Sequence, residues 1–307
     1  MNRPLTRPIL LAALAAVTSF LPALADTRIE KTLKLDPGGK LTVAADAGSL
    51  TITGSTSPGA HLLLTSDKDD LESRFDLKLE ELPGELRITL KKKESITSWS
   101  TWFNNAKVAF EIQVPTKTRT QLRTGGGHVA VHALEGDATA ETSGGHIEVG
   151  DLRGNLTAET SGGHISVKKI SGNAKVETSG GHIEADGVDG NLSADTSGGH
   201  IEIRNAAGRV DADTSGGHVE VSFAKGNAHG GKIESSGGSI TVEVDPTVDL
   251  NIDASTSGGS VRTDIPIKVV GKLRGSSVQG TLGKGGEILK VHTSGGSVSI
   301  GARDDSN

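Results

Sequence analysis

The chain has 307 residues, of which 42 are glycine and seven are aromatic, five Phe and two Trp. Average glycine usage is about half of that fraction, so the composition argues against an ordinary globular domain with a large aromatic core. The lack of cysteine excludes a disulfide framework, a thiolate metal site, a cysteine nucleophile and a lipid anchor on cysteine. The formal charge of −6 provides no basic surface for nucleic acid.

Residues 1–25 have the pattern of a secretory signal peptide. Arg3 and Arg7 form a charged start, residues 9–17 form an apolar run, and Ala25 ends a cleavage site of small-x-small type. The sequence therefore predicts cleavage near Ala25 and an exported product, either periplasmic or extracellular at the cell surface. No stretch reaches the ~20 apolar residues of a membrane helix, so no membrane span is expected.

Residues 26–123 precede the tandem repeats of residues 124–301 and carry separate strand signals. Residues 41–52 alternate like one early coil of a repeat, and residues 75–79 and 86–90 alternate around a Pro83-Gly84 turn, which predicts a β-hairpin. Residues 108–114 form a further strand that leads straight into the first regular coil. We expect this region to cap the repeats, because an uncovered end would be an unpaired edge that promotes aggregation.

Three aromatic residues lie together in the polar segment SITSWSTWFNN: Trp99, Trp102 and Phe103. Clustered aromatics on a loop can anchor a protein or glycan partner. They can equally cover the end of a repeat stack. The sequence leaves both interpretations open.

A repeat with a period of 18 residues dominates the chain. TGGGHV at Thr124 is followed by five TSGGHI or TSGGHV units, without an insertion. The repeat is marked by His128, His146, His164, His182, His200 and His218. Ser239, Ser260, Ser277 and Ser297 then take the marker position in looser units, which predicts ten successive marker positions, and Ser49 holds it in the early coil.

Each period contains two short strands separated by glycine turns. In the period that starts at His146, residues 147–149 and 156–160 alternate apolar and polar side chains, and Gly154 and the Ser161-Gly162-Gly163 run supply the turns. One such unit cannot bury its apolar face, but stacked units build a continuous core. The sequence therefore predicts an all-β fold, a single-stranded parallel β-solenoid with 18-residue coils. We expect it to be right-handed, as parallel crossovers generally are, with a polar tail over residues 302–307.

Other repeat architectures and enzymes fit the sequence less well. A left-handed hexapeptide helix would require apolar residues at Arg153 and Glu159, and calcium-binding nonapeptide repeats require GGxGxD where this chain has GGHIE. Neither a nucleophile elbow nor a phosphate-binding loop between strand and helix is present in the sequence. We predict neither catalysis nor a required cofactor.

Three segments carry a resemblance to a known family: GGKLTVAADAGSLTITG, FEIQVPTKTRTQLRTGGGHVAVHALEG and the repeated ETSGGHIEV units. Over residues 28–301 the chain resembles the bacterial putative adhesin family, exported β-solenoid domains of unknown function. The resemblance implies a β-solenoid. Members usually carry Asp or another small polar residue after the glycines, and the histidines of this chain depart from that pattern.

The six histidines are the distinctive feature of this sequence. If Ile147 points inward, His146 points outward, so the imidazoles are predicted to stack about 4.8 Å apart. Two residues further on, Glu148, Glu184, Glu202 and Glu220 form a parallel row that Ser166 interrupts. The histidines could form a hydrogen-bonded surface row, bind Zn, Cu or Ni with the carboxylates, or act as a pH-sensing surface.

A second acidic row is predicted on the opposite wall, at Glu141, Glu159, Glu177, Asp195 and Asp213. We interpret it as a solvated face. The sequence as a whole predicts an exported, non-enzymatic surface-contact module, adhesin-like or scaffold-like, whose unknown partner is an envelope or cell-surface protein or glycan. Divalent metal binding by the six marker histidines is the alternative function.

Overall fold

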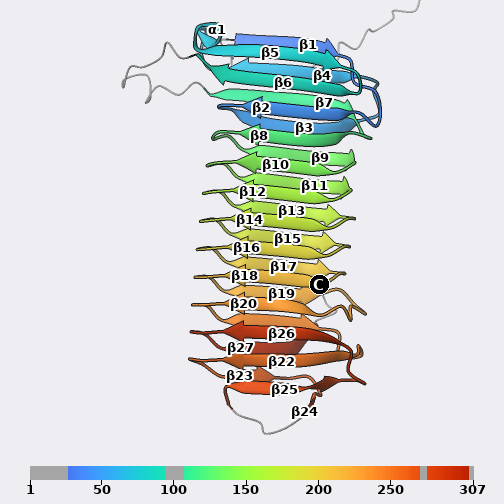
Figure 1. Cartoon of the computed structure of the whole chain (residues 1–307), viewed down its shortest axis with the longest axis vertical. Helices are drawn as coiled ribbons and strands as arrows, with labels where there is room; N and C mark the ends of the chain where they lie inside the picture. Colours follow the sequence, from blue (N-terminus) through green and yellow to red (C-terminus); the bar gives the residue numbers. More distant parts are fainter. Residues whose placement is uncertain (1–26, 94–106, 270–274, 304–307) are drawn as a thin grey trace, which may run out of the picture.

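The computed structural model describes residues 27–93, 107–269 and 275–303. These residues form a rod of stacked coils in which two long sheets run side by side (Figure 1). A short helix, α1 (Leu71–Arg74), lies at the N-terminal end of the rod. The all-β fold and the stacked parallel strands agree with the predicted β-solenoid. Within the described ranges, no helix is long and apolar enough to cross a membrane.

The first sheet, called sheet A, has 13 strands. In spatial order they are β1 (Thr27–Leu33), β4 (Ala60–Ser66), β7 (Val108–Pro115), β3 (Ser49–Ser55), β9 (Val129–Glu135), β11 (Ile147–Arg153), β13 (Ile165–Ile170), β15 (Ile183–Val188), β17 (Ile201–Ala206), β19 (Val219–Phe223), β21 (Ile240–Val244), β27 (Val298–Ala302) and β23 (Val261–Thr263).

The second sheet, called sheet B, has 14 strands. In spatial order from the same end they are β5 (Phe75–Leu82), β6 (Glu85–Lys92), β2 (Lys40–Ala45), β8 (Arg119–Thr124), β10 (Ala138–Thr142), β12 (Leu156–Thr160), β14 (Ala174–Thr178), β16 (Leu192–Thr196), β18 (Val210–Thr214), β20 (Gly231–Ser235), β26 (Glu287–Thr293), β22 (Leu250–Thr256), β25 (Ser277–Leu282) and β24 (Lys268–Val269).

In the middle of the rod, chain order and spatial order coincide. Each coil gives one strand to sheet A and the next strand to sheet B. In sheet A, Ile147 pairs with Val129 on one side and Ile165 on the other, each 18 residues away. In sheet B, Leu156 likewise pairs with Ala138 and Ala174. All these pairings are parallel, so equivalent side chains of successive coils stack in columns.

The core between the sheets is thin, and its two walls differ. Sheet A contributes buried Ile and Val, such as Ile165 and Val167, while sheet B contributes smaller residues such as Ala158 and Ala194. Leu152 fills the corner between its two strands and is 1% exposed. The small side chains of sheet B bring the two sheets close together, which explains how the chain builds a core with few aromatic residues.

At the ends of the rod, the structure corrects the expected order of the coils. The strand over residues 108–114 does not lie next to the first regular coil, because β3 lies between β7 and β9. At the other end, β26 and β27 are inserted between the β20–β21 coil and the β22–β23 coil. Figure 1 shows both insertions as breaks in the colour order.

This insertion also makes the predicted series of serine markers wrong in part. Spatially, Ser239 is followed by Ser297 and then by Ser260, as their hydrogen bonds show. Ser277 is not a marker. It begins β25 in sheet B, which pairs antiparallel with β22. The GSSV segment imitates the motif but forms part of the C-terminal end of the rod.

Antiparallel strands lie at both ends of the rod, and the N-terminal edges carry charges on their inner side. The β5–β6 pair is the hairpin that the alternation around Pro83-Gly84 predicts. Lys31 in edge strand β1 pairs with buried Leu62, and Glu81 in edge strand β5 pairs with buried Leu86, so both charged residues lie on the core side of the sheets. Inward-pointing charges at an edge disfavour the addition of another strand.

Candidate functional site

The TSGG turn has the same hydrogen bonds in successive coils. The hydroxyl of Thr160 donates to the carbonyl oxygen of Gly145 in the preceding coil at 2.9 Å and accepts from the amide of Gly163 at 3.3 Å. Thr160 is 7% exposed, so both bonds satisfy a buried hydroxyl. The same two bonds are made by Thr142, Thr178, Thr196 and Thr214. Threonine therefore fixes where the next residue of the motif lies.

The second glycine of the turn is required by close backbone contact between coils. A Cβ atom on Gly163 would lie 1.8 Å from the carbonyl oxygen of Gly145, whereas one on Gly162 would meet its nearest atom at 3.9 Å. Glycine at the second position lets each turn rest directly on the preceding one. The residue that follows it is thereby held at the same place in every coil.

The marker histidines stack as a column, here called the histidine column: His128, His146, His164, His182, His200 and His218. Adjacent ring centroids lie 4.8–5.2 Å apart. In the centre of the column the rings are parallel, with an angle of 2° between the planes of His164 and His182. All six residues are exposed on the outer face of sheet A. The predicted outward stack is therefore present.

Hydrogen bonds join the histidine column from coil to coil. The backbone amide of His164 donates to Nδ1 of His146 at 2.8 Å, and that of His182 donates to Nδ1 of His164 at 2.8 Å. The same bond recurs along the column and extends to the amide of Ser239 at the end. Serine hydroxyls continue the series at Ser49, Ser239 and Ser297, each accepting from the next coil. The histidine column is therefore a hydrogen-bonded surface row, one of the three interpretations that the sequence left open.

These bonds bear on the proposed metal site. A neutral imidazole whose Nδ1 accepts a hydrogen bond carries its proton on Nε2, so neither nitrogen has a free lone pair for a metal. Coordination would require a tautomer change and the loss of a bond between coils. Across the described ranges, no group of three or more His, Asp or Glu side chains is placed to hold a metal ion. Zn, Cu or Ni binding stays a prediction that the hydrogen bonds do not favour.

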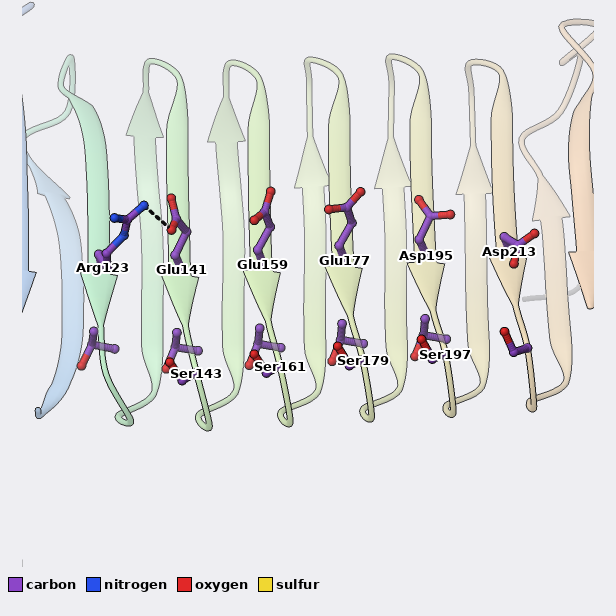
Figure 2. Close-up of a pocket in the computed structure, with 16 residues that line it drawn as sticks. Arg123, Glu141, Ser143, Glu159, Ser161, Glu177, Ser179, Asp195, Ser197 and Asp213 are labelled. Carbon is purple, nitrogen blue, oxygen red and sulfur yellow. Dashed lines mark ion pairs between the residues drawn. The ribbon is translucent and has the colours of Figure 1, made fainter. Parts of the chain in front are cut away.

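The outer face of sheet B carries the second acidic row, extended beyond the predicted residues. In register along the strands lie Arg123, Glu141, Glu159, Glu177, Asp195, Asp213, Glu234 and His292. Figure 2 shows the first carboxylates of this row at the same level on successive strands, with the serines nearer the turns. Six carboxylates thus stand in one column between a cation and a histidine.

Most of this row, from Arg123 to Asp213, also lines an elongated groove of about 610 Å³. The other rim of the groove is formed by the turn serines Ser143, Ser161, Ser179, Ser197 and Ser215, and buried threonines of the same turns also line it. Glu141, Glu159 and Glu177 are half-buried. The groove therefore offers a row of carboxylates beside a row of hydroxyls, both repeated once per coil.

Neighbouring cations neutralise part of the groove. Arg123 pairs with Glu141 at 2.5 Å and Lys175 with Glu177 at 2.7 Å, and Lys232 pairs with Glu234 at 2.8 Å in the same row, next to the groove. Burial raises the pKa of Asp213, and the carboxylates of Glu234 and Asp195 raise it further. Among the described residues, Glu159, Asp195 and Asp213 of the groove form no ion pair, so its negative charge is concentrated there.

Several residues that belong to the rows on the outer faces of the sheets were not predicted from the sequence. His292 joins the acidic row only because β26 is inserted beside β20, which spacing does not reveal. Arg123, 18 residues before Glu141, and Glu234, directly before the SSGG turn, could have been predicted from the repeat. The Gly-Asn dipeptides at Asn155, Asn173 and Asn191 could have been recognised, since each asparagine oxygen accepts the backbone amide of the equivalent residue in the next coil. Trp99, Trp102, Phe103 and the signal peptide lie outside the described residues.

The chain matches the model of a protein family described as Toastrack DUF4097 over residues 39–301. That match covers the early coil, the N-terminal strands other than β1, the histidine column and the acidic groove. The chain belongs to the Toastrack DUF4097 family. None of the curated proteins matches it. The recognition of a bacterial adhesin-type family from the strand and SGG motifs is thereby confirmed.

The solved structures to which the chain is similar include three bacterial proteins. A putative cell adhesion protein from Clostridium sporogenes is 16% identical, with 90% of this chain and 100% of that chain covered and a TM-score of 0.26. A putative adhesin from Bacteroides fragilis is 15% identical, with coverage of 90% and 97% and a TM-score of 0.46. A putative lipid binding protein from Parabacteroides distasonis is 14% identical, with coverage of 89% and 96% and a TM-score of 0.37.

Proposed function

We propose that this Toastrack protein is an exported surface-contact module, adhesin-like or scaffold-like, that holds an elongated partner along the rod without catalysing a reaction. The observation that carries the proposal is the repetition of the same side chains on both faces, coil after coil, from the first to the last histidine of the column. An active site needs a local arrangement that differs from its surroundings. A repeated surface instead suits a partner that makes the same contact many times.

The partner that we propose is an envelope or cell-surface protein or glycan. The groove on sheet B is the concave part of the repeated surface, and its serine and carboxylate rows can donate and accept hydrogen bonds at every coil. A glycan chain with hydroxyls on each sugar or an extended peptide with basic side chains would match these rows. Contacts of this kind are individually weak, so we expect binding to depend on several consecutive coils.

Export is part of the proposal, supported by the charged start, apolar run and small-residue cleavage site of residues 1–25. Expression of the full chain in its bacterial host should give a mature protein that begins at Asp26, in the periplasm or at the cell surface. Fractionation followed by N-terminal sequencing measures both. An intact N-terminus in the cytoplasmic fraction would contradict export without affecting the proposed contact surface.

The contact surface is tested with immobilised residues 26–307 against intact bacterial cells, a glycan array and basic peptides. In one variant, Glu159→Gln, Glu177→Gln and Asp195→Asn neutralise the groove. A matched variant, Glu148→Gln, Glu184→Gln and Glu202→Gln, removes three carboxylates from the opposite face. We expect the groove variant to bind at least about tenfold more weakly, as the loss of several charge-assisted hydrogen bonds implies, and the matched variant to bind normally.

Two outcomes would redirect the proposal. Equal binding by both variants would move the contact away from the groove, and a third variant, Trp99→Ala with Trp102→Ala, then tests the predicted aromatic contact at Trp99, Trp102 and Phe103. No binding by the wild type to cells, glycans or peptides would contradict a surface-contact function.

A further inference from the structure

We propose that the histidine column is an acid-sensitive seam: protonation of its rings breaks the hydrogen bonds that join successive TSGGH turns, so this edge of the rod opens in mild acid while both sheets stay paired. The inference concerns the rod itself and does not depend on which partner the protein binds. It rests on the hydrogen bonds of the column, the spacing of its rings and the serines that replace histidine at both ends.

The hydrogen bonds require neutral rings. Each Nδ1 accepts the amide of the next coil at 2.8–3.0 Å, as between His182 and His200. An imidazolium carries a proton on both nitrogens and accepts no hydrogen bond. Protonation would therefore place two donors, the ring N–H and the backbone N–H, against each other. One link between coils is lost for every ring that takes up a proton.

The spacing of the rings adds a second cost. Two protonated neighbours would place like charges 4.8–5.2 Å apart along the column. Burial lowers the pKa of His182 from 6.5, and the neighbouring rings of His164 and His200 lower it further. Because the folded ring binds its proton less tightly than the unfolded chain does, the unfolded chain holds more protons in acid. The contribution of His182 to the free energy of unfolding is therefore fully present above about pH 6.5 and is lost as the pH falls below it.

Carboxylates on the same outer face oppose this effect, and cations add to it. Two positions along the strands from the histidines lie Glu148, Glu184, Glu202 and Glu220, and four positions along lie His132, Lys168, Asp186 and Arg204. Arg204 already pairs with Glu184 and Glu202. Two positions after His128 and His164 stand Ala130 and Ser166, which carry no charge, so carboxylates that could stabilise protonated rings flank only part of the column.

The chain contains its own reference for a seam that does not titrate. Ser297 donates its amide to Oγ of Ser239 at 3.2 Å, and Ser260 donates to Oγ of Ser297 at 3.3 Å. These serine links have the same place in the coil and the same donor as the histidine links. Their hydroxyl acceptors do not change charge in mild acid. Only the part of the seam built from histidine should respond to pH.

Amide hydrogen exchange of the wild-type protein at about pH 7.5 and about pH 5, corrected for the intrinsic exchange rate, tests the seam directly. Protection of the amides of His164, His182 and His200 should fall at least about tenfold in acid, because each loses its hydrogen-bond acceptor when the ring of the preceding coil is protonated. The amides of Ser260 and Ser297 should keep their protection. Sheet amides such as that of Val176 should keep theirs as well, because the opening is confined to the edge.

In the variant with His146→Ser, His164→Ser, His182→Ser and His200→Ser, the amides of residues 164, 182 and 200 should no longer lose protection in acid. Their hydrogen bonds to the preceding coil should be kept at neutral pH. Persistence of the effect in this variant, or equal loss of protection at Ser297, would overturn the proposal. If the variant does not fold, ¹⁵N spectra of the wild-type imidazoles decide instead. Column rings protonated on Nδ1 at neutral pH would refute the seam, and protons on Nε2 alone would support it.

Discussion

The coils of the middle of the rod and those of its two ends are stacked in different orders. In the middle, each coil rests on the coil that precedes it in the chain, so the fold follows the order of the repeat. At both ends, one coil is inserted out of order, β2–β3 near the N-terminus and β26–β27 near the C-terminus. The C-terminal insertion places the last two strands of the described chain between two other coils, and the N-terminal insertion does the same for β2–β3, which follow edge strand β1. A repeat protein thus closes its ends with strands that the repeat itself does not specify.

The largest effect on stability should come from deleting one coil from the C-terminal end, compared with deleting one coil from the middle. Deletion of residues 287–307 takes β26 and β27 from between β20–β21 and β22–β23, so we expect the C-terminal end to unfold and to become protease-sensitive. Deletion of residues 147–164, a similar length, joins His146 directly to Ile165 and preserves every register of the middle. We expect that shorter rod to remain folded and cooperative, because each coil contacts only its neighbours.

Limited proteolysis and thermal unfolding of the two deletions provide the measurement. Deletion of residues 304–307 alone serves as the control for loss of the C-terminus. A C-terminal deletion as stable as the shortened rod would show that the inserted coil is no more important than a coil of the middle.

The next largest effect should come from the backbone contact between coils. Gly163→Ala would place Cβ 1.8 Å from the carbonyl oxygen of Gly145, so the coils must move apart. We expect a loss of roughly 3 kcal/mol or more in the free energy of unfolding, at the upper end for overpacking. Gly162→Ala, one residue earlier, meets nothing closer than 3.9 Å and should change stability by less than about 0.5 kcal/mol. Urea denaturation of both variants measures the difference, and similar values for the two would contradict the stacking argument.

A smaller effect is expected from the buried hydroxyl of the turn. Thr178→Val keeps the shape of the side chain but leaves the carbonyl of Gly163 and the amide of Gly181 without their partner. The cost of unsatisfied buried groups is about 1–3 kcal/mol. Thr157→Val, on the outer face of β12, is the matched substitution and should be close to neutral. Equal unfolding midpoints in urea would show that water replaces the hydroxyl at the turn.

The sequence predicted the middle of the rod almost completely and its ends only in outline. The period of 18, the inward set from Ile147 to Thr160 and the outward histidines follow from alternation and glycine spacing, which local geometry determines. The insertion of β27 beside β21 is a choice between equivalent coil edges, so no local pattern specifies it, and the order of Ser260 and Ser297 was consequently wrong. Ser277 was misplaced because GSSV imitates the motif. The histidine stack could be predicted, but its hydrogen bonds could not, because they depend on which nitrogen faces the next turn. The groove was missed because it requires the turns and the acidic row together.

The smallest effect concerns a column of residues with a strained backbone near the C-terminal ends of the sheet A strands. Ala133, Asp151, Lys169 and Asn205 have φ between 52° and 58°, and Gly187 holds the same place in its coil with a φ of 68°. A left-handed conformation costs a residue other than glycine about 1–2 kcal/mol, while glycine costs about 0.4–1 kcal/mol through the freedom of the unfolded chain. Ala133→Gly should therefore stabilise the rod by about 0.5 kcal/mol. Gly187→Ala, whose Cβ meets nothing closer than 3.7 Å, should destabilise it by a similar amount. Opposite shifts of the urea midpoint would show that strain at this corner, rather than contact, separates the two residues, whereas shifts in the same direction would contradict it.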